Sequence, residues 1–246
     1  MSAAAVLSAV QGFVCEASLD VQARTDLIDA VFALDKAALQ FFYDVAVDAG
    51  HTPDDIRRRV VAVTLEYAAV QVADDLADGE GSYIESFSRA APGVAWGLQH
   101  LFFLACARAG LSLDAITRAS ARLLRMLDGQ QRDVRTTEWE LRSARAAARM
   151  NELQFSAYFD ILLGGTRHAA EAVELGEKLG FALHVVGDSR SADPRIATLA
   201  GSERVELLEQ ALGVVSELER SALGAVARHA RHYQTYLRTE LRRAAG

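Results

Sequence analysis

The feature that most constrains the fold is an apolar run over residues 60–73 that ends in a cluster of aspartates. The run carries almost no charge, which predicts a buried helix. Thr52 and Pro53 mark its start, because a hydroxyl caps a helix N-terminus and proline fits the first helical position. Gly79 marks its end, because glycine readily adopts the conformation that stops a helix. The sequence therefore predicts one long helix over residues 53–78.

The rest of the chain carries similar signals for where helices begin and end. The three prolines, Pro53, Pro92 and Pro194, each stand where a helix is predicted to begin. No alternating run of β-branched residues indicates a sheet. These signals favour an all-α fold, a helical bundle with a single domain over residues 1–246. The expected helices cover residues 20–49, 53–78, 93–109, 113–134, 137–163, 168–187, 202–217 and 219–243, after a looser N-terminal piece.

Composition argues against several kinds of partner. With 246 residues, the chain is long enough to bury a substantial core. Apolar residues make up 51% of it and charged residues 24%, which is the profile of a soluble globular protein. The net charge of −7 argues against nucleic acid or an anionic membrane surface as the main partner.

The sequence also favours a cytoplasmic location. Cys15 and Cys106 are the only cysteines and have no metal-ligand spacing, so we expect a reducing compartment. No basic residue precedes Arg24, so the apolar N-terminus lacks the start of a signal peptide. Residues 92–110 are the most membrane-like segment, but polar side chains interrupt them well short of a span. We therefore do not expect an integral membrane protein.

Asp74, Asp75 and Asp78 stand on the last turn of the predicted helix. At helical spacing Asp74 and Asp78 share one face, and Asp75 lies one position round. A helix C-terminus carries partial negative charge, so each acid there costs about 0.3–1 kcal/mol. Hard divalent cations such as Mg2+ take oxygen ligands of this kind and would offset the charge. The sequence predicts a magnesium site at these residues; the alternative is a solvated, acidic helix end.

Three further patterns support a site built from facing helices. A second apolar helix, expected over residues 168–187, runs into Asp188 at its C-terminus. Gln130 and Asp133 lie three positions apart, on one face of a third helix. The next helix carries a stripe of arginines that could face an anion, although such a stripe is also typical of a solvated face. These arginines are Arg142, Arg145 and Arg149.

At these residues the chain resembles the class I trans-isoprenyl diphosphate synthases and their all-helical relatives. Residues 74–78, Asp-Asp-Leu-Ala-Asp, resemble the first aspartate-rich motif of that family, DDxxD. Residues 129–133, Gly-Gln-Gln-Arg-Asp, are similar to its Gly-Gln-x-x-Asp element. Residues 179–188, Leu-Gly-Phe-Ala-Leu-His-Val-Val-Gly-Asp, resemble the lead into its second aspartate motif. Order and spacing fit over residues 30–195.

The resemblance implies the fold of the class I isoprenoid synthases and a Mg2+-dependent enzyme that ionises an allylic prenyl diphosphate. It implies that Asp74, Asp75 and Asp78 bind the metal and that Asp188 is also catalytic. The metal would neutralise the leaving diphosphate, and a dry helical cavity would protect the allylic cation. It also implies a homodimer. The expected substrate-binding residues are Gln130, Asp133, Arg142, Arg145, Arg149, His184 and Ser191.

The second motif departs from the family pattern. Gly187 stands where the family has the first aspartate, and Ser191 stands where it has the last. Asp188 remains, and His184 replaces the usual glutamine.

The basic residues that hold isopentenyl diphosphate in the family are also missing. Gln154 and Phe155 replace a lysine-threonine pair, and no arginine pair follows Asp78. Lys36 lies near the expected basic box but lacks its neighbouring glycines and arginine. A second diphosphate needs its own cations. The chain is therefore expected to have lost the isopentenyl diphosphate site.

This pattern leaves several hypotheses open. The first is a prenyltransferase that delivers the allylic cation to an acceptor other than isopentenyl diphosphate, similar to the farnesyl-transferring enzyme of moenomycin assembly. The second is a class I terpene cyclase, because Gly187-Asp188-Ser189-Arg190-Ser191 partly resembles the cyclase motif. The third is a non-catalytic regulatory subunit of an active synthase. An ordinary chain-elongating synthase is the remaining alternative.

Overall fold

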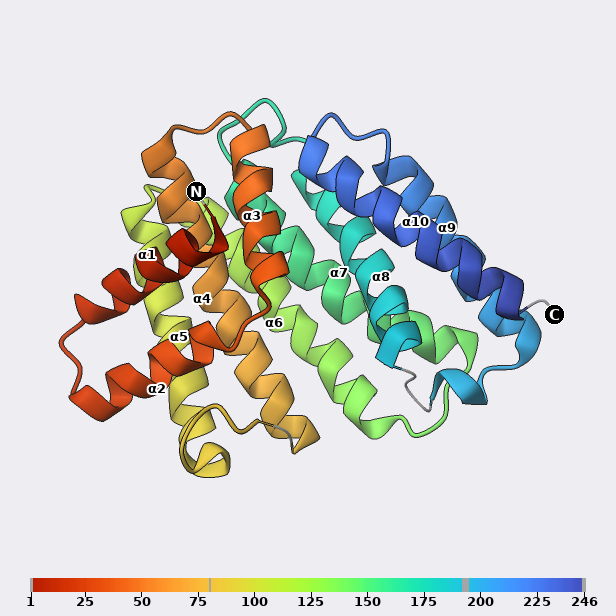
Figure 1. Cartoon of the computed structure of the whole chain (residues 1–246), viewed down its shortest axis with the longest axis horizontal. Helices are drawn as coiled ribbons and strands as arrows, with labels where there is room; N and C mark the ends of the chain where they lie inside the picture. Colours follow the sequence, from red (N-terminus) through yellow and green to blue (C-terminus); the bar gives the residue numbers. More distant parts are fainter. Residues whose placement is uncertain (1, 80, 192–194, 245–246) are drawn as a thin grey trace. The chain divides into compact units, whose positions relative to one another are not determined.

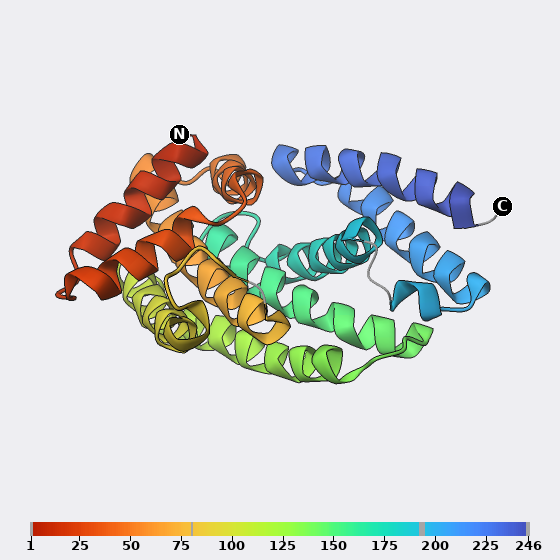
Figure 2. The same cartoon turned by 60° about the horizontal axis from the view of Figure 1, so that its bottom comes forward.

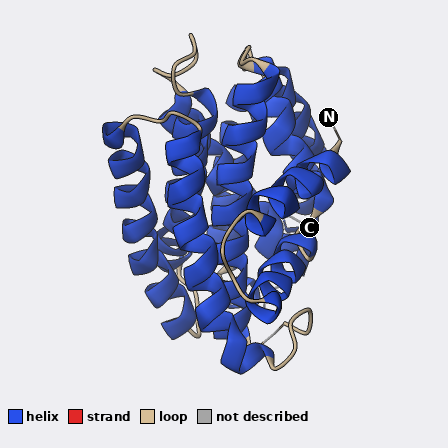
Figure 3. Ribbon diagram, turned by 90° about the vertical axis from the view of Figure 1, so that its left-hand side faces the viewer, coloured by secondary structure: helices blue, strands red, loops and turns tan. Residues whose placement is uncertain are grey.

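The structure is a computed structural model that describes residues 2–79, 81–191 and 195–244, apart from the side chains of residues 132–134 and 197. Every regular element in these residues is helical: ten α-helices and one short 3-10 helix. Figure 3 shows the helices joined by loops and turns. The predicted all-α fold class is confirmed.

Contacts divide the chain into two compact units, Met1–Ile116 and Thr117–Gly246. Each unit is described by itself, and a single domain over residues 1–246 stays a prediction. Figure 1 labels the helices in chain order and Figure 2 gives a second view of them. In the first unit they are α1 (Ala3–Cys15), α2 (Val21–Phe32), α3 (Lys36–Asp48), α4 (Pro53–Asp78) and α5 (Phe87–Arg108).

The long helix α4 is the centre of the first unit. It contacts α1, α2, α3 and α5, and α4 and α5 lie side by side (Figures 1 and 2). The Thr52 side chain accepts a hydrogen bond from the Asp55 amide, and Pro53 takes the first helical position. At the other end Gly79 adopts a left-handed conformation with φ 72°. The predicted helix over residues 53–78 is confirmed.

Two other expectations for the first unit are wrong. Residues 20–49 form two helices, because the Asp35 side chain accepts a hydrogen bond from the Ala37 amide and so caps a new helix, α3. Pro92 lies inside α5, which begins at Phe87, and not at a helix start. Proline has no backbone N–H, so α5 lacks the hydrogen bond that residue 92 would otherwise donate to the Ser88 carbonyl. The N-terminal piece is a regular helix, α1.

The second unit contains most of α6 and all later elements. The loop between α6 and α7 ends at Glu140, which caps α7 together with Ser143. The helix α7 therefore begins later than expected. The helix expected over residues 168–187 begins at Ala172 and continues past Gly187. Pro194 lies outside the described residues. The elements are α6 (Leu113–Arg135), α7 (Leu141–Leu163), α8 (Ala172–Ser191), the 3-10 helix η1 (Ile196–Thr198), α9 (Gly201–Leu218) and α10 (Gly224–Ala244).

Glycines hold α7 and α8 in direct backbone contact. A Cβ atom on Gly180 would lie 2.2 Å from the Asn151 carbonyl oxygen, and one on Gly176 would lie 2.5 Å from the Phe155 carbonyl oxygen. Real Cβ atoms essentially never come so close. The spacing Gly-x-x-x-Gly places both glycines on one face of α8, which is therefore the face that packs against α7.

Among the residues that the structure describes, one helix, α5, is long and apolar enough to cross a membrane by length and composition alone. A core helix of a soluble protein passes the same test. One face of α5 packs against α4, while Trp96, Phe103 and Leu104 are exposed. These exposed side chains form an apolar surface on the outside of α5.

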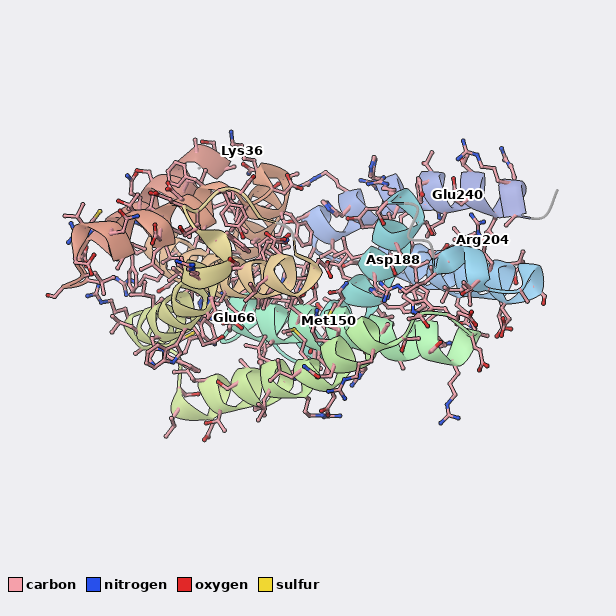
Figure 4. All side chains as sticks on the ribbon, turned by 90° about the horizontal axis from the view of Figure 1, so that it is seen from below. Lys36, Glu66, Met150, Asp188, Arg204 and Glu240 are labelled. Carbon is pink, nitrogen blue, oxygen red and sulfur yellow. The ribbon has the colours of Figure 1, made fainter. Side chains whose placement is uncertain are left out.

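Among the described residues of the first unit, one carboxyl group is buried in the core. Glu66 is 1% exposed (Figure 4), and its Oε2 atom has no hydrogen-bond partner among the described residues. Burial raises the pKa of Glu66 to about 7, and a hydrogen bond with Gln99 lowers it in part. Cys106 is a neighbour, and its pKa rises to about 12 because of burial and of the nearby Glu66 charge. The core therefore favours the protonated form of Glu66.

We expect Glu66→Gln to stabilise the protein at pH 8 and to have little effect at pH 4.5. Because the pKa is raised on folding, the folded state gains a proton, and stability falls as pH rises from 4.5 to about 7. The shift corresponds to about 3 kcal/mol. Thermal unfolding between pH 4.5 and pH 8 measures this difference. The exposed Glu85→Gln variant is the control, and equal pH trends in Glu66→Gln and wild type would contradict the argument.

Candidate active site

The three carboxylates at the acidic end of α4 differ in how far they are exposed to solvent. Asp74 and Asp75 are half-buried and Asp78 is exposed. Asp74 and Asp78 are separated by one helical turn, as the spacing predicts. Gly79 ends the helix directly after them, so the negative end of the helix dipole points at the same place. The three acids thus lie on the last turn of α4, where the sequence places them; metal binding there stays a prediction.

Asp75 is engaged by protein groups on both of its oxygens. Gln71 donates from Nε2 to Oδ1 at 2.7 Å, and Tyr83 donates from its hydroxyl to Oδ2 at 2.7 Å. Burial, together with the hydrogen bond and charge of Asp75, raises the pKa of the Tyr83 hydroxyl well above its usual range. Tyr83 also packs edge-on against Phe87, with ring centroids 5.2 Å apart. The loop after α4 is thus attached to the helix end through Asp75.

The donor chemistry at this helix end suits Mg2+, which prefers carboxylate oxygens. Among the described residues, however, no three His, Cys, Asp or Glu side chains converge closely enough to hold a metal ion by themselves. Asp74 and Asp78 fit as two ligands on one face of α4. A metal ion there would need further oxygen ligands besides these two.

In the second unit, Asp188 lies in the last turn of α8 (Figure 4), one helical turn after His184. His184 Nε2 is 3.2 Å from Asp188 Oδ2, and Asn151 on α7 is 3.4 Å from His184 Nδ1. His184 is buried, at 7% exposure. The Ser191 hydroxyl donates to the Asp188 carbonyl at 3.2 Å. Residues 184, 188 and 191 therefore form one local cluster.

An aromatic side chain from the loop between α6 and α7 completes this cluster. The Trp139 ring lies 6.0 Å from the His184 ring, and the Arg195 guanidinium lies 4.7 Å from the Trp139 ring centroid. The Trp139 amide donates to Thr198 Oγ1 at 2.7 Å. Trp139 is 3% exposed, so the indole fixes one side of the histidine.

The Gly-Gln-x-x-Asp element is described only in part. Gly129 lies against α7, where an added Cβ would come within 3.0 Å of Met150 Cβ, and Gln130 is half-buried. The side chain of Asp133 lies outside the described residues. The glycine of this element therefore serves close packing of α6 on α7, and substrate binding by Gln130 and Asp133 stays a prediction.

The three arginines of the predicted stripe differ in their surroundings. Arg142 is exposed. Arg145 donates to Gln210 on α9 and lies over the Phe181 ring at 5.5 Å. Arg149 pairs with Glu152 at 2.6 Å and with Glu177 at 3.2 Å. Arg149 is therefore already neutralised by acids of its own unit, while the role of all three in substrate binding stays a prediction.

Two positions that carry a lysine and a threonine in the resembled family hold uncharged residues here, an amide and an aromatic ring. Gln154 is buried, at 4% exposure, and donates from Nε2 to the Tyr158 hydroxyl at 2.8 Å. The Phe155 and Tyr158 rings meet edge-on at 5.7 Å. Lys36 is exposed at the first position of α3. No charge is thus available from residues 154 and 155 to bind an anion.

Sequence reasoning missed two residues of these clusters, Tyr83 and Trp139. Tyr83 lies eight residues after its partner Asp75, in a loop without a motif. Trp139 lies far in sequence from His184, and no local pattern joins them. One signal was available: large aromatic residues in short polar loops are usually buried against a neighbouring element.

Comparisons with known proteins agree with the fold. No family model matches the sequence, and no curated protein sequence is similar to it. Solved structures are similar to it over nearly the whole chain, among them the following three. A geranyltranstransferase from Thermotoga maritima has 18% identity, a TM-score of 0.73 and coverage of 96% of this chain and 97% of its own.

The other two structures give nearly the same values. An isoprenoid synthase family member from Thermotoga neapolitana has 20% identity and a TM-score of 0.72, with coverage of 94% of this chain and 97% of its own. A geranyltransferase from Legionella pneumophila has 15% identity and a TM-score of 0.72, with coverage of 97% and 96%. The chain therefore has the isoprenoid synthase fold predicted from its motifs.

Proposed function

We propose that this protein is a Mg2+-dependent enzyme that ionises an allylic prenyl diphosphate and transfers the prenyl cation to an acceptor other than isopentenyl diphosphate. The observation that carries the proposal is the intact acidic end of α4, with Asp74, Asp75 and Asp78 on one turn, in a chain with this fold. Fold alone does not define a reaction, so the site residues have to support it.

Asp74 and Asp78 are the proposed metal ligands, because both lie on one face of the helix end. Mg2+, when bound, would supply positive charge against the charge that develops on the leaving diphosphate. Asp75 is held by Gln71 and Tyr83, which fixes its orientation beside the other two acids. Asp188, whose Oδ2 atom lies 3.2 Å from His184 Nε2, is proposed as a further acidic group of the same reaction.

Aromatic side chains close to α4 suit a cationic intermediate. The Phe42 and Tyr67 rings meet edge-on at 5.6 Å, and Phe42 is fully buried. Aromatic faces stabilise cations, and burial excludes the water that would quench them. Burial, followed by the charges of Asp35, Asp74 and Asp75, raises the pKa of Tyr67, which therefore stays neutral.

The proposal that the acceptor is not isopentenyl diphosphate rests on the absence of lysine or arginine at the positions that would bind its diphosphate. Two diphosphates in one cavity repel each other unless separate lysines or arginines neutralise the second one. Residue 154 is a buried amide that donates to Tyr158, and residue 155 is an aromatic ring. Arg59, at the start of α4, lies roughly 22 Å along the helix from Asp74, at about 1.5 Å per residue. These features support an acceptor without a diphosphate.

We expect purified protein with Mg2+ to release pyrophosphate from geranyl, farnesyl or geranylgeranyl diphosphate, and isopentenyl diphosphate at about 1 mM neither to be incorporated nor to compete. Product analysis with labelled isopentenyl diphosphate measures both. Label in a longer prenyl diphosphate would contradict the proposal and indicate a chain-elongating synthase. A cyclised or linear hydrocarbon or alcohol as the defined product would instead support a class I terpene cyclase. No turnover of any allylic diphosphate would favour a regulatory subunit.

We also propose that the protein forms a homodimer. The exposed apolar surface of α5, made by Trp96, Phe103 and Leu104, supports this, because such surfaces commonly mark protein interfaces. Trp96 is 69% exposed. A large exposed indole is a typical anchor residue of an interface.

A further inference from the structure

A cavity lies far from the acidic end of α4. It has a volume of about 420 Å³ and opens among α1, α4 and α5, wholly inside the first unit. Its apolar floor is formed by the buried side chains of Ala9, Val61 and Ala105. Arg58 on its rim lies roughly 24 Å along α4 from Asp74, at about 1.5 Å per residue. The cavity is therefore separate from the proposed metal site.

One arginine on the rim is fixed in place by protein groups. The Arg108 guanidinium lies 4.8 Å from the centre of the Phe13 ring and pairs with Glu16 at 2.5 Å. This stacking and pairing hold both the arginine and the aromatic ring at the cavity edge. Glu16 neutralises Arg108, so Arg108 adds little net charge to the rim.

Two other arginines on the rim have no such partner. Arg57 and Arg58 line the cavity and are exposed, and neither makes an ion pair or side-chain hydrogen bond with any residue that the structure describes. Asp54 is the remaining acid of the lining, and it lies in the first turn of α4, where the helix dipole favours a carboxylate. The rim thus keeps a net positive charge in a chain whose net charge is −7.

We propose that this cavity binds a small phosphorylated amphiphile. Arg57 and Arg58 bind the phosphate group, because guanidinium groups match phosphate oxygens in pairs. The apolar part lies against Ala9, Val61 and Ala105. A volume of about 420 Å³ is within the usual range for small-molecule sites. The guanidinium groups supply the positive charge, so binding needs no metal ion.

Calorimetric titration without metal tests the proposal independently of the proposed reaction. The whole protein in EDTA is titrated with hexyl phosphate, with inorganic phosphate and with 1-hexanol. EDTA removes metal-dependent binding at the α4 aspartates. We expect hexyl phosphate to bind at least about tenfold more tightly than inorganic phosphate or hexanol, because it alone uses both the arginines and the apolar floor.

Two variants with opposite expected effects locate the site. The double variant Arg57→Gln/Arg58→Gln should weaken hexyl phosphate binding about tenfold or more. The matched control, Arg220→Gln/Arg238→Gln, removes the same two charges from exposed positions in the second unit and should leave binding within about twofold. Glu16→Gln frees Arg108 from its partner and should tighten binding severalfold. All five positions are exposed, and circular dichroism checks that each variant is folded.

Several outcomes would overturn the proposal. These are no heat of binding with hexyl phosphate up to about 10 mM, equal losses in the two double variants, or weaker binding in Glu16→Gln. Inorganic phosphate binding as tightly as hexyl phosphate would show that the apolar floor is not used. Hexanol binding as tightly as hexyl phosphate would show that the arginines are not used.

Discussion

Asp74→Ala is expected to lower turnover of an allylic diphosphate by a factor on the order of 10²–10³, the usual cost of removing one group that stabilises charge in the transition state. The same variant should be as stable as wild type, or more stable by about 0.3–1 kcal/mol, because an acid leaves the negative end of a helix. Turnover is measured as pyrophosphate release, and stability by thermal unfolding without metal.

The control for this variant is Asp29→Ala. Asp29 is an exposed acid in the last turn of α2, so it shares the helix-end position of Asp74 without belonging to the proposed site. Asp29→Ala should leave turnover unchanged. Asp188→Ala should reduce turnover less than Asp74→Ala, since its motif keeps only one aspartate. A large loss of thermal stability in Asp74→Ala would indicate a structural role and contradict the proposed one.

Gly180→Ala should destabilise the second unit strongly. The added methyl group would lie 2.2 Å from the Asn151 carbonyl oxygen and 2.7 Å from the Glu152 amide nitrogen. Both are backbone atoms of α7, so the two helices would have to separate. Overpacking of this kind costs about 1–3 kcal/mol or more, against a gain of about 1 kcal/mol from the helix propensity of alanine. The change is measured by chemical denaturation.

The same substitution at Gly213 is the matched control. Gly213 lies inside α9, and outside its own stretch of helix no described atom lies within 4 Å of the position that its Cβ would take. Gly213→Ala should therefore stabilise the protein by up to about 1 kcal/mol. If Gly180→Ala were as stable as Gly213→Ala, the close contact between α7 and α8 would not exist in solution.

Local signals predicted some helix ends well and others poorly. The bounds of α4 followed from Pro53 and Gly79, because a proline and a left-handed glycine act through the backbone alone. The predicted end of α8 at residue 187 was too early, since Gly187 is not among the glycines with positive φ and the helix continues through it to Ser191. The break before α3 depends on the Asp35 side chain, and no glycine or proline marks it.

The candidate site was predictable as a set of motifs but not as a set of contacts. The acids of α4 and Asp188 could be named from spacing, because helical periodicity fixes which residues share a turn. The partners of those acids could not. Tyr83 reaches Asp75 through a loop, and Trp139 reaches His184 through tertiary packing. Such contacts depend on how the chain folds back on itself, which periodicity does not encode.

The hydrogen bond between Tyr83 and Asp75 ties the loop after α4 to the end of that helix. Asp75 Oδ2 accepts the Tyr83 hydroxyl at 2.7 Å, and the Tyr83 ring packs on Phe87 at the start of α5. Any ligand that draws Asp75 Oδ2 toward itself competes with the tyrosine for that oxygen. A ligand bound through that oxygen and the hydrogen bond that holds the loop would therefore weaken each other.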